Sequence, residues 1–350
     1  MSKFVGIQIA ILALMVCTAC AEKAVEDPIE PAAKNRPVPA TDTPPVGAPA
    51  NRDLSYTEQR QPCSNYEPLR QALFGDLHVH SSLSFDAVAG RIDTRPADAH
   101  DFARGKTIPF FPQDEQGKPT DSTTIDRPLD FLALTDHSEL LGERALCSNP
   151  ESPAFDQQFC TEYRKVEFRG TLMMASVISQ QDPQRIEMLC GKDGQLCLQH
   201  SKAPWKETIE AAEAAYDRSE ECTFTSFIGY EYTGTPNDSN YHRNVIFRNG
   251  NVPQLPVSYV EAPKDYQLWQ ALDGVCSNTN NCDYMTIPHN SNLSNGLLLS
   301  PYADMELTAG NKRAYGETRL DREPIMEIFQ HKGGSECVNG LANVLGEADE

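Results

Sequence analysis

The amino-acid sequence predicts an α/β fold in which parallel strands alternate with helices and close into a barrel of the TIM type or a relative of it. Two observations predict this fold. Short apolar runs are near-continuous rather than alternating, which is typical of strands buried on both faces. Each run is followed at once by His, Asp or Glu, as expected when polar side chains stand at the carboxyl ends of barrel strands.

The strands and helices are placed from these runs. The predicted strands cover residues 72–77, 129–134, 224–230, 244–247, 284–287 and 325–329. Phe155–Ser179 and the alanine-rich segment Trp205–Arg218 are predicted helices. Residues 101–127 and 143–221 are too long for simple connections, so we expect insertions over the barrel mouth. Local disulfides are expected to pin the second insertion.

Composition and charge limit the function. The chain has 350 residues and a hydrophobic content of 39%, which is enough for one sizeable core. Its formal net charge is -20. Phosphate backbones attract basic surfaces, so nucleic acid is not expected as a partner. The same charge argues against binding of an acidic membrane face by the protein body.

The first residues have the layout of an export signal. Lys3 is followed by an apolar run from Phe4 to Val16 and a small-residue end, which indicates a signal peptide over residues 1–20. Cys20 stands where a lipoprotein signal places its acylated cysteine, and ordinary cleavage around this position is the alternative. The Pro/Ala-rich residues 21–52 are predicted to be a disordered tether. We expect a periplasmic protein or outer-membrane lipoprotein that touches the membrane only through a lipid anchor.

Cysteine usage agrees with export. Nine cysteines follow Cys20, and an oxidising compartment makes disulfides the default expectation. Three pairs lie close in sequence, namely Cys147 with Cys160, Cys190 with Cys197, and Cys276 with Cys282. The remaining cysteines are Cys63, Cys222 and Cys337. Because their number is odd, at least one of them lacks a partner in this chain.

The first candidate site residues follow the first two predicted strands. His78 and His80 are alternate residues, so both imidazoles point to the same face of a strand. Asp86 adds a carboxylate at the same rim, and His137 ends the next strand. A ligating imidazole usually donates its other N–H to a carboxylate or carbonyl. The candidates for that supporting role are Asp76 and Asp136.

Three further residues stand at later strand ends. Glu231 follows an apolar run, His242 opens another, and His289 closes a third. Each is unremarkable alone, but the coincidence at strand ends predicts a metal site. The predicted ligands are His78, His80, Asp86, His137, Glu231, His242 and His289. His100 and His200 lie in the insertions and are predicted to be structural.

Mixed imidazole and carboxylate ligands suit two or three ions of zinc, manganese or iron. Two such ions clamp the attacking and leaving oxygens of a displacement, which fits hydrolysis of a phosphate ester on a small anionic substrate. The candidate anion-binding residues are Arg243, Asn290, Asn292 and Lys332. No catalytic side chain is assigned, because a metal-activated water needs none. Asp136 and His331 are candidates for support.

The order of these motifs resembles the PHP (polymerase and histidinol phosphatase) superfamily. The amino-acid sequences of residues 74–81, 134–138 and 287–290 are most similar to its branch known as domain-of-unknown-function family 3604. The likeness runs from about Phe74 to His331. The resemblance implies a distorted (β/α)7 TIM-like barrel with a trinuclear metal site.

The resemblance also implies how the ligands are shared. His78, His80 and Glu231 would hold one ion, and Glu231, His242 and His289 would hold the second. The third ion would lie at Asp86 and His137. Glu327 corresponds to an acid of the family in a supporting position.

One departure from the family pattern stands out. The family closes its site with an Asp-x-His on the last strand, and none occurs after His331. We therefore expect a C-terminally truncated member with an incomplete barrel, and the activity of this chain stays open. A partner for Cys337 would then lie in the missing part.

Two alternatives remain open. The leaving group could be sulfate or an amide-like bond rather than phosphate. The protein could also be a non-catalytic envelope lipoprotein that binds metal or a ligand.

Overall fold

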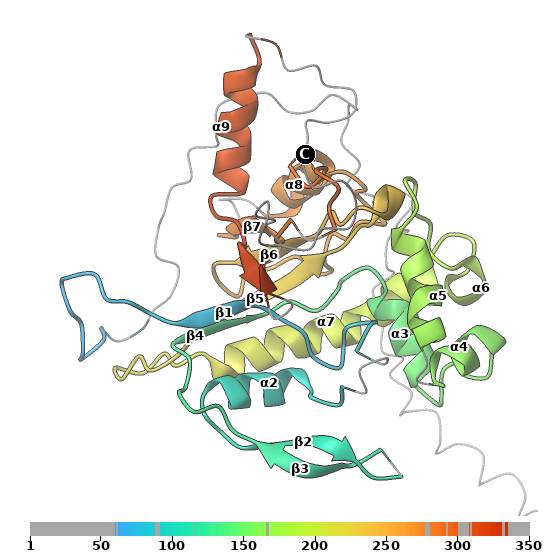
Figure 1. The fold of residues 1–350 in the computed structure, drawn as a ribbon, viewed down its shortest axis with the longest axis horizontal. Helices are drawn as coiled ribbons and strands as arrows, with labels where there is room; N and C mark the ends of the chain where they lie inside the picture. The colour runs from blue at the N-terminus through green and yellow to red at the C-terminus, as the bar shows by residue number, and fades with distance from the viewer. Residues whose placement is uncertain are drawn as a thin grey trace, which may run out of the picture. The chain divides into compact units, whose positions relative to one another are not determined.

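A mixed sheet of five strands lies at the centre of the computed structural model (Figure 1). The structure describes residues 62–87, 92–115, 117–165, 168–276, 281–291, 293–299 and 310–330, together with residues 60, 308, 333 and 334. The predicted signal peptide, the tether and the possible lipid anchor at Cys20 lie outside the described residues, as does Cys337.

The strand order in the sheet is β1-β4-β5-β6-β7. Parallel pairing joins β1 to β4 and β4 to β5, whereas β6 is antiparallel to both β5 and β7. The bounds are Gly75–Val79 for β1, Phe131–Leu134 for β4, Thr225–Tyr232 for β5, Arg243–Phe247 for β6 and Tyr284–Pro288 for β7.

This topology contradicts the predicted barrel. A (β/α)7 barrel needs parallel strands with a crossover helix between each pair, and the described sheet is mixed, with helices on only some of its connections. The connection from β5 to β6 holds only a short 3₁₀ helix, Pro236–Asp238. Antiparallel strands can be joined by so short a connection, whereas parallel strands cannot.

The strand directions gather several chain segments at one edge of the sheet. β7 is antiparallel to β6, so it runs in the same direction as β1, β4 and β5. The carboxyl ends of these strands therefore meet the amino end of β6. Tyr232 pairs with Arg243, and Arg243 pairs with Pro288. The residues that directly follow β4, β5 and β7 or precede β6 are thus neighbours in space.

Helices cover the sheet unevenly. Helix α2 (Pro96–Ala103) contacts β4, and α7 (Gln195–Ala215) contacts α2 and β5. On the other part of the sheet, Trp269 of α8 (Asp265–Val275) donates its Nε1–H to Thr286 Oγ1 of β7 at 3.1 Å. Figure 1 shows α8 and α9 (Lys312–Arg322) beyond β6 and β7, away from α2 and α7.

The two predicted insertions contain ordered elements. Residues 101–127 include the hairpin of β2 (Ile108–Gln113) and β3 (Pro119–Thr123). Residues 143–221 include most of α3 (Leu141–Ser148) and all of α7. Between these two helices lie α4 (Gln158–Tyr163), α5 (Phe168–Ile178) and α6 (Glu187–Cys190).

Two helix predictions need correction. The predicted helix 155–179 is divided into α4 and α5. The predicted helix beginning at Trp205 begins ten residues earlier at Gln195, with Pro204 inside it. Close packing holds this region together, because a Cβ added at Gly142 of α3 would lie 1.8 Å from the carbonyl oxygen of Cys197 in α7.

The predicted strand 325–329 is wrong. Only Phe329–Gln330 forms a strand, β8, which pairs with β9 (Gly333–Gly334) in a separate two-stranded sheet. Ile325, Ile328 and Phe329 are exposed. The apolar run therefore does not mark a buried strand here.

The main core lies around β5, β6 and the helices packed on them. Trp205 of α7 meets Tyr230 of β5 and Phe247 of β6 at ring-centroid distances of 5.9 and 6.4 Å. All three rings are buried. The aromatic contacts fix α7 against the strands that end at the candidate site.

Four disulfides are present among the described residues. The three predicted pairs, Cys147–Cys160, Cys190–Cys197 and Cys276–Cys282, are confirmed. The fourth, Cys63–Cys222, joins two cysteines that the sequence left unassigned. Disulfides persist in oxidising compartments, so these bonds indicate such an environment.

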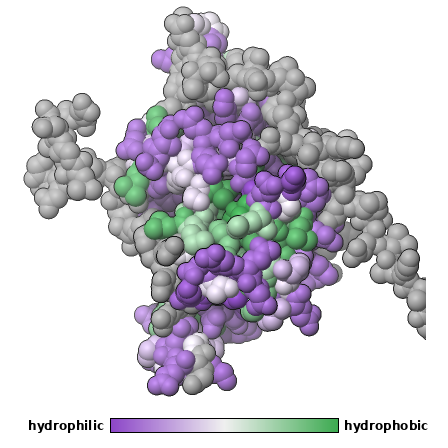
Figure 2. Space-filling view, turned by 90° about the vertical axis from the view of Figure 1, so that its right-hand side faces the viewer, coloured by the Kyte–Doolittle hydropathy of each residue, from purple (hydrophilic) through white to green (hydrophobic). Residues whose placement is uncertain are grey.

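An apolar band lies on one face of the molecule. Figure 2, which faces the side where α3 to α6 lie in Figure 1, shows an apolar band between two hydrophilic regions. Leu172 of α5 and Met188 of α6 are among the exposed apolar residues. In the described part of the chain, no helix combines the length and the hydrophobicity needed to cross a bilayer.

Candidate metal centre

Glu231, at the end of β5, is the centre of a buried cluster of imidazoles. Its Oε2 atom lies 2.9 Å from His80 Nε2, 3.0 Å from His137 Nδ1 and 3.6 Å from His78 Nε2. Its Oε1 atom lies 2.9 Å from His242 Nδ1. The Glu231 side chain is only 1% exposed. One carboxylate therefore contacts four histidines that come from three other chain segments.

These close contacts are not all hydrogen bonds. Glu231 Oε2 and His80 Nε2 are buried and lack a hydrogen-bond partner among the described residues, although they are 2.9 Å apart. His242 Nε2 is buried without a hydrogen-bond partner as well. Buried polar atoms are usually satisfied. A cation site needs ligand atoms such as these, which lie close together and have no hydrogen bonds to give up.

Several overlapping groups of side chains could hold a metal ion, with ligand atoms within 4.8 Å of one another. Two of them are the two complete ligand sets that the family resemblance implied. Asp86 and His137, expected at the third ion, are joined by His80. The groups are His78–His80–Glu231, Glu231–His242–His289, His80–Asp86–His137 and His78–His289–Glu327. All seven predicted ligands thus lie together.

Neighbouring groups orient the imidazoles. Glu327 Oε1 lies 2.9 Å from His78 Nδ1, a contact that fits its predicted supporting role. His289 Nδ1 lies 2.7 Å from the carbonyl oxygen of Asn290 and donates to it. Such contacts fix which ring nitrogen is left for an ion.

Three further side chains that contact the imidazoles were missed in the sequence. Ser84 Oγ lies 3.1 Å from His80 Nδ1, and Thr233 Oγ1 lies 2.6 Å from His137 Nδ1. Gln330 Nε2 lies 2.9 Å from His289 Nε2, the ring nitrogen that an ion would take, so this amide would have to move for an ion to bind there. Only Thr233 had a signal, because it follows Glu231 by two residues. Serine and glutamine are too common near strand ends to be singled out.

Asp76 and Asp136 were predicted to accept imidazole N–H groups, but their carboxylates contact other groups. Asp76 accepts the backbone N–H of His78 at 2.9 Å. Asp136 accepts the N–H and the hydroxyl of Ser81 at 2.6 and 2.7 Å. Asp136 therefore fixes the loop after β1.

Arg243 does not fit the role of an anion-binding residue. Its side chain is fully buried and forms ion pairs with Glu323 at 2.6 Å and Asp265 at 3.2 Å. It also donates to the carbonyl of Leu298 at 2.7 Å. Asn290 is buried beside His289, with its backbone N–H donated to Glu327 Oε2 at 2.8 Å. His331, Lys332 and Asn292 lie outside the described residues.

A family model described as "Protein of unknown function (DUF3604)" matches residues 67–350, which is more than half of the chain. The chain belongs to the DUF3604 family. The resemblance to this family, based on three short motifs, is thereby confirmed. No curated protein and no solved structure matches the chain. The family description names no activity, so function has to be argued from the centre itself.

The electrostatics of this DUF3604 centre depend on Glu231. Burial raises the pKa of its carboxyl, but His137, His242 and His78 outweigh burial and hold the pKa well below its usual value. Burial lowers the pKa of His78, but the nearby carboxylates of Glu231 and Glu327, the latter 2.9 Å from His78 Nδ1, raise it to about 10. The cluster is therefore anionic at its middle. The pKa values of His78 and His137 are raised, whereas burial lowers the pKa of His242 to about 4 and also lowers that of His289.

His100, His200 and the described cysteines of this DUF3604 chain do not join the centre. His100 of α2 is buried, with Nδ1 3.4 Å from Ser226 Oγ, and burial lowers its pKa to about 4. His200 lies in α7. The ligand atoms of Glu143, Cys190 and Cys197 are close enough for a metal site, but the two sulfurs form a disulfide and are not thiolates.

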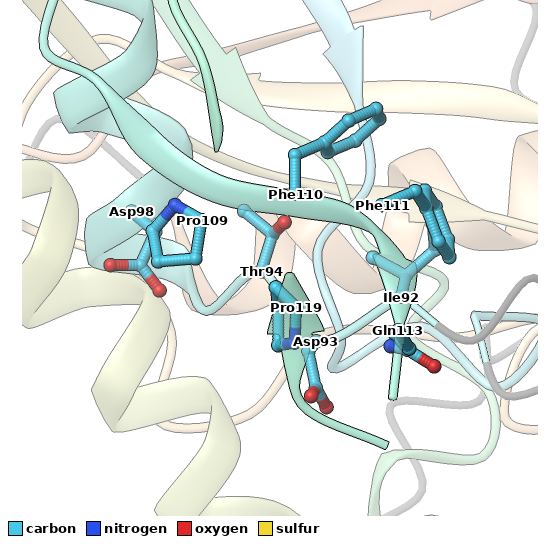
Figure 3. A pocket seen from close by; sticks show the side chains of 9 residues that line it. All are labelled: Ile92, Asp93, Thr94, Asp98, Pro109, Phe110, Phe111, Gln113 and Pro119. Atoms are coloured by element: carbon cyan, nitrogen blue, oxygen red, sulfur yellow. The ribbon is translucent and has the colours of Figure 1, made fainter. Parts of the chain in front are cut away.

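A separate hollow lies between α2 and the β2–β3 hairpin (Figure 3). No residue of the metal centre lines it. Figure 3 shows Phe110 and Phe111 on one strand, with the carboxylates of Asp93 and Asp98 on the other side. Asp98 already accepts the backbone N–H of Arg95 at 3.0 Å, as a helix cap. The hollow therefore has no evident connection to the chemistry of the centre.

Proposed function

We propose that this protein is a metal-dependent hydrolase of phosphate esters that uses two or three divalent ions. The observation that carries the proposal is the convergence of imidazole nitrogens on the unsatisfied, buried Oε2 of Glu231. A buried carboxylate surrounded by imidazoles costs free energy unless charge compensates it. A divalent ion supplies that compensation.

The donor set fits such ions. Histidine and carboxylate ligands suit zinc, manganese or iron. Glu231 belongs to two adjoining groups of candidate ligands, so its two oxygens could serve neighbouring ions. When bound, paired divalent ions stabilise the negative charge on the attacking and leaving oxygens of a phosphoryl transfer. This chemistry motivates a phosphate ester as substrate.

The protein's own residues would orient and enclose these ions. Glu327, Ser84 and Thr233 hold the rings of His78, His80 and His137, respectively. The small anionic substrate would approach from the side of Asp86, which at 43% is the most exposed of the candidate carboxylates.

The likeness of the histidine motifs to the PHP superfamily supports the hydrolase class. The sheet topology adds nothing to that support. Export, with attachment through Cys20 as the sole membrane contact, is part of the proposal. The disulfides support an oxidising compartment and are silent on the lipid anchor.

Metal content and ester choice test the proposal. Elemental analysis of the purified protein is expected to find bound transition metal, with loss in His80→Ala and retention in the control His200→Ala. The wild type is expected to hydrolyse p-nitrophenyl phosphate and not p-nitrophenyl sulfate. Preference for the sulfate would replace the substrate class. Full metal content in His80→Ala, or metal without hydrolysis of either ester, would contradict the hydrolase.

A further inference from the structure

A buried carboxylate outside the metal centre joins three segments of the chain. Glu139 is fully buried two residues after His137. Its Oε1 accepts the backbone N–H of Thr233 at 2.7 Å and that of Tyr259 at 3.1 Å. The Ser138 hydroxyl donates to the same oxygen at 3.2 Å. The side chain thus ties the end of β4 to the end of β5 and to the loop that follows β6.

The contact with Thr233 leads directly to the centre. Thr233 donates its backbone N–H to Glu139, while its hydroxyl lies 2.6 Å from His137 Nδ1. His137 Nε2 then faces Asp86, with Oδ2 at 3.4 Å. The position of Thr233 therefore fixes the ring that belongs to the His80–Asp86–His137 group.

Glu139 does not act as the partner of a cation. Among the described residues no Lys or Arg forms an ion pair with its carboxylate, and Oε2 is buried without a hydrogen-bond partner. The nearest arginine contact is to its backbone, where Arg185 donates to the carbonyl oxygen at 3.0 Å. A buried, unpaired carboxyl group costs stability. Its remaining oxygen is used for three hydrogen bonds, one of which holds the backbone of Thr233.

Arg185 links the same junction to the helical insertion. Its guanidinium pairs with Glu143 of α3 at 3.1 Å and with Glu261 at 2.8 Å. All three side chains lie outside the metal centre. Arg185 therefore holds the backbone of Glu139, while the carboxyl of Glu139 holds the backbone of Thr233.

We propose that Glu139 is a positioning residue that sets the ring orientation of His137 through Thr233, and thereby the geometry of the metal position at His80, Asp86 and His137. This inference rests on the proposed function for its metal part. The orientation of the ring is a property of the metal-free protein as well.

Matched variants separate positioning from folding. Thr233→Val removes the hydroxyl and keeps the shape, whereas Thr233→Ser keeps the hydroxyl. Glu139→Leu removes the acceptor, whereas Glu139→Gln keeps an oxygen for the two backbone N–H groups. We expect the Val and Leu variants to lose roughly 10- to 100-fold in affinity for the weakest-bound Co²⁺ ion, as for other groups that orient ligands. Their visible Co²⁺ spectra are expected to change, and the Ser and Gln variants should resemble the wild type.

A second measurement needs no metal. Imidazole ¹H–¹⁵N correlation spectra of the metal-free protein report the protonation and hydrogen bonding of the His137 ring nitrogens. We expect the Val and Leu variants to change the His137 signals and leave those of His200 in place. Wild-type signals for His137 in both variants would overturn the inference, even if the melting temperature fell. If the wild type binds no Co²⁺, the proposed function fails, and the metal-free spectra still decide whether Glu139 positions His137.

Discussion

At the scale of single residues, Glu231 decides whether the cluster is a metal centre or a packed group of histidines. A carboxylate that merely paired with histidines would satisfy its oxygens by hydrogen bonds, but Oε2 has no hydrogen-bond partner in the part of the chain that the structure describes. We expect Glu231→Gln to weaken metal binding at least roughly 100-fold, more than the loss of an orienting contact would. Chelator competition with the purified protein measures this, and Glu210→Gln, an exposed glutamate of α7, is the matched control. Equal affinities would remove Glu231 from the site.

The pKa of His78 gives the metal-free protein a distinct pH dependence. Glu231 and Glu327 overcome burial and raise this pKa from 6.5 to about 10, and the pKa of His137 is also raised. A raised histidine pKa contributes stability that is complete below 6.5 and is lost as the pH rises toward 10. We therefore expect the urea midpoint of the metal-free protein to fall across this range.

Bound ions should change that pH dependence. Metal ions need neutral imidazoles, so their affinity rises with pH and offsets the loss. Urea titrations with a chelator and with added zinc make the comparison. A metal-free midpoint that stays constant or rises over the range would mean that Glu231 and Glu327 do not hold the His78 proton.

The candidate metal ligands could be predicted from the sequence better than the side chains that orient them. Strand-end histidines and acids are rare enough for their coincidence to be informative, and all seven predicted ligands lie together. Ser84 and Glu139 carry no such signal, because each acts on a histidine through a contact that only the fold creates. The prediction that Arg243 binds an anion was wrong because sequence neighbours need not share a face. Arg243 stands beside His242 in sequence, but adjacent residues of a strand point to opposite faces.

At the scale of elements, the strands were predicted better than their directions. The runs at β1, β4, β5, β6 and β7 were found within a few residues. Parallel pairing throughout was inferred from buried apolar runs, but β6 is antiparallel and equally buried. The ten residues between Glu231 and His242 were the available sign, since they are too few for a crossover helix. The amino end of β6 still reaches the edge of the sheet where the site lies. His242 therefore lies beside the other candidate ligands, although the predicted topology was wrong.

Arg243 is better explained as the residue that connects β6 to α8 and to the end of α9 by ion pairs. It pairs with Asp265 of α8 and with Glu323 directly after α9, and Arg319 of α9 pairs with the same two acids. Removing one partner of a buried pair costs about 3–5 kcal/mol. We expect Arg243→Met to lower the free energy of unfolding by that amount in urea titrations.

The matched control for Arg243 is Arg313→Ala, at an exposed pair with Glu317 on α9. That variant should unfold like the wild type. If Arg243→Met kept full stability and instead raised KM for the anionic substrate, the original anion-binding prediction would be restored.

At the scale of the whole molecule, the disulfides differ in what they constrain. Cys276–Cys282 closes a separation of 6 residues, whereas Cys63–Cys222 spans 159 and ties the segment before β1 to the approach to β5. Loop-closure entropy in the unfolded chain grows with the logarithm of loop length. The chain-entropy relation gives about 5 kcal/mol for the long loop and about 2 kcal/mol for the short one.

The double variant Cys63→Ala/Cys222→Ala should therefore lose more stability than Cys276→Ala/Cys282→Ala, by roughly 3 kcal/mol in the free energy of unfolding. The contrast is informative because the short disulfide is the more buried of the two, so packing alone predicts the opposite order. Urea titrations of both variants under oxidising conditions measure it. A larger loss in the Cys276/Cys282 variant would mean that core packing, rather than the covalent link across the sheet, dominates the stability of the domain.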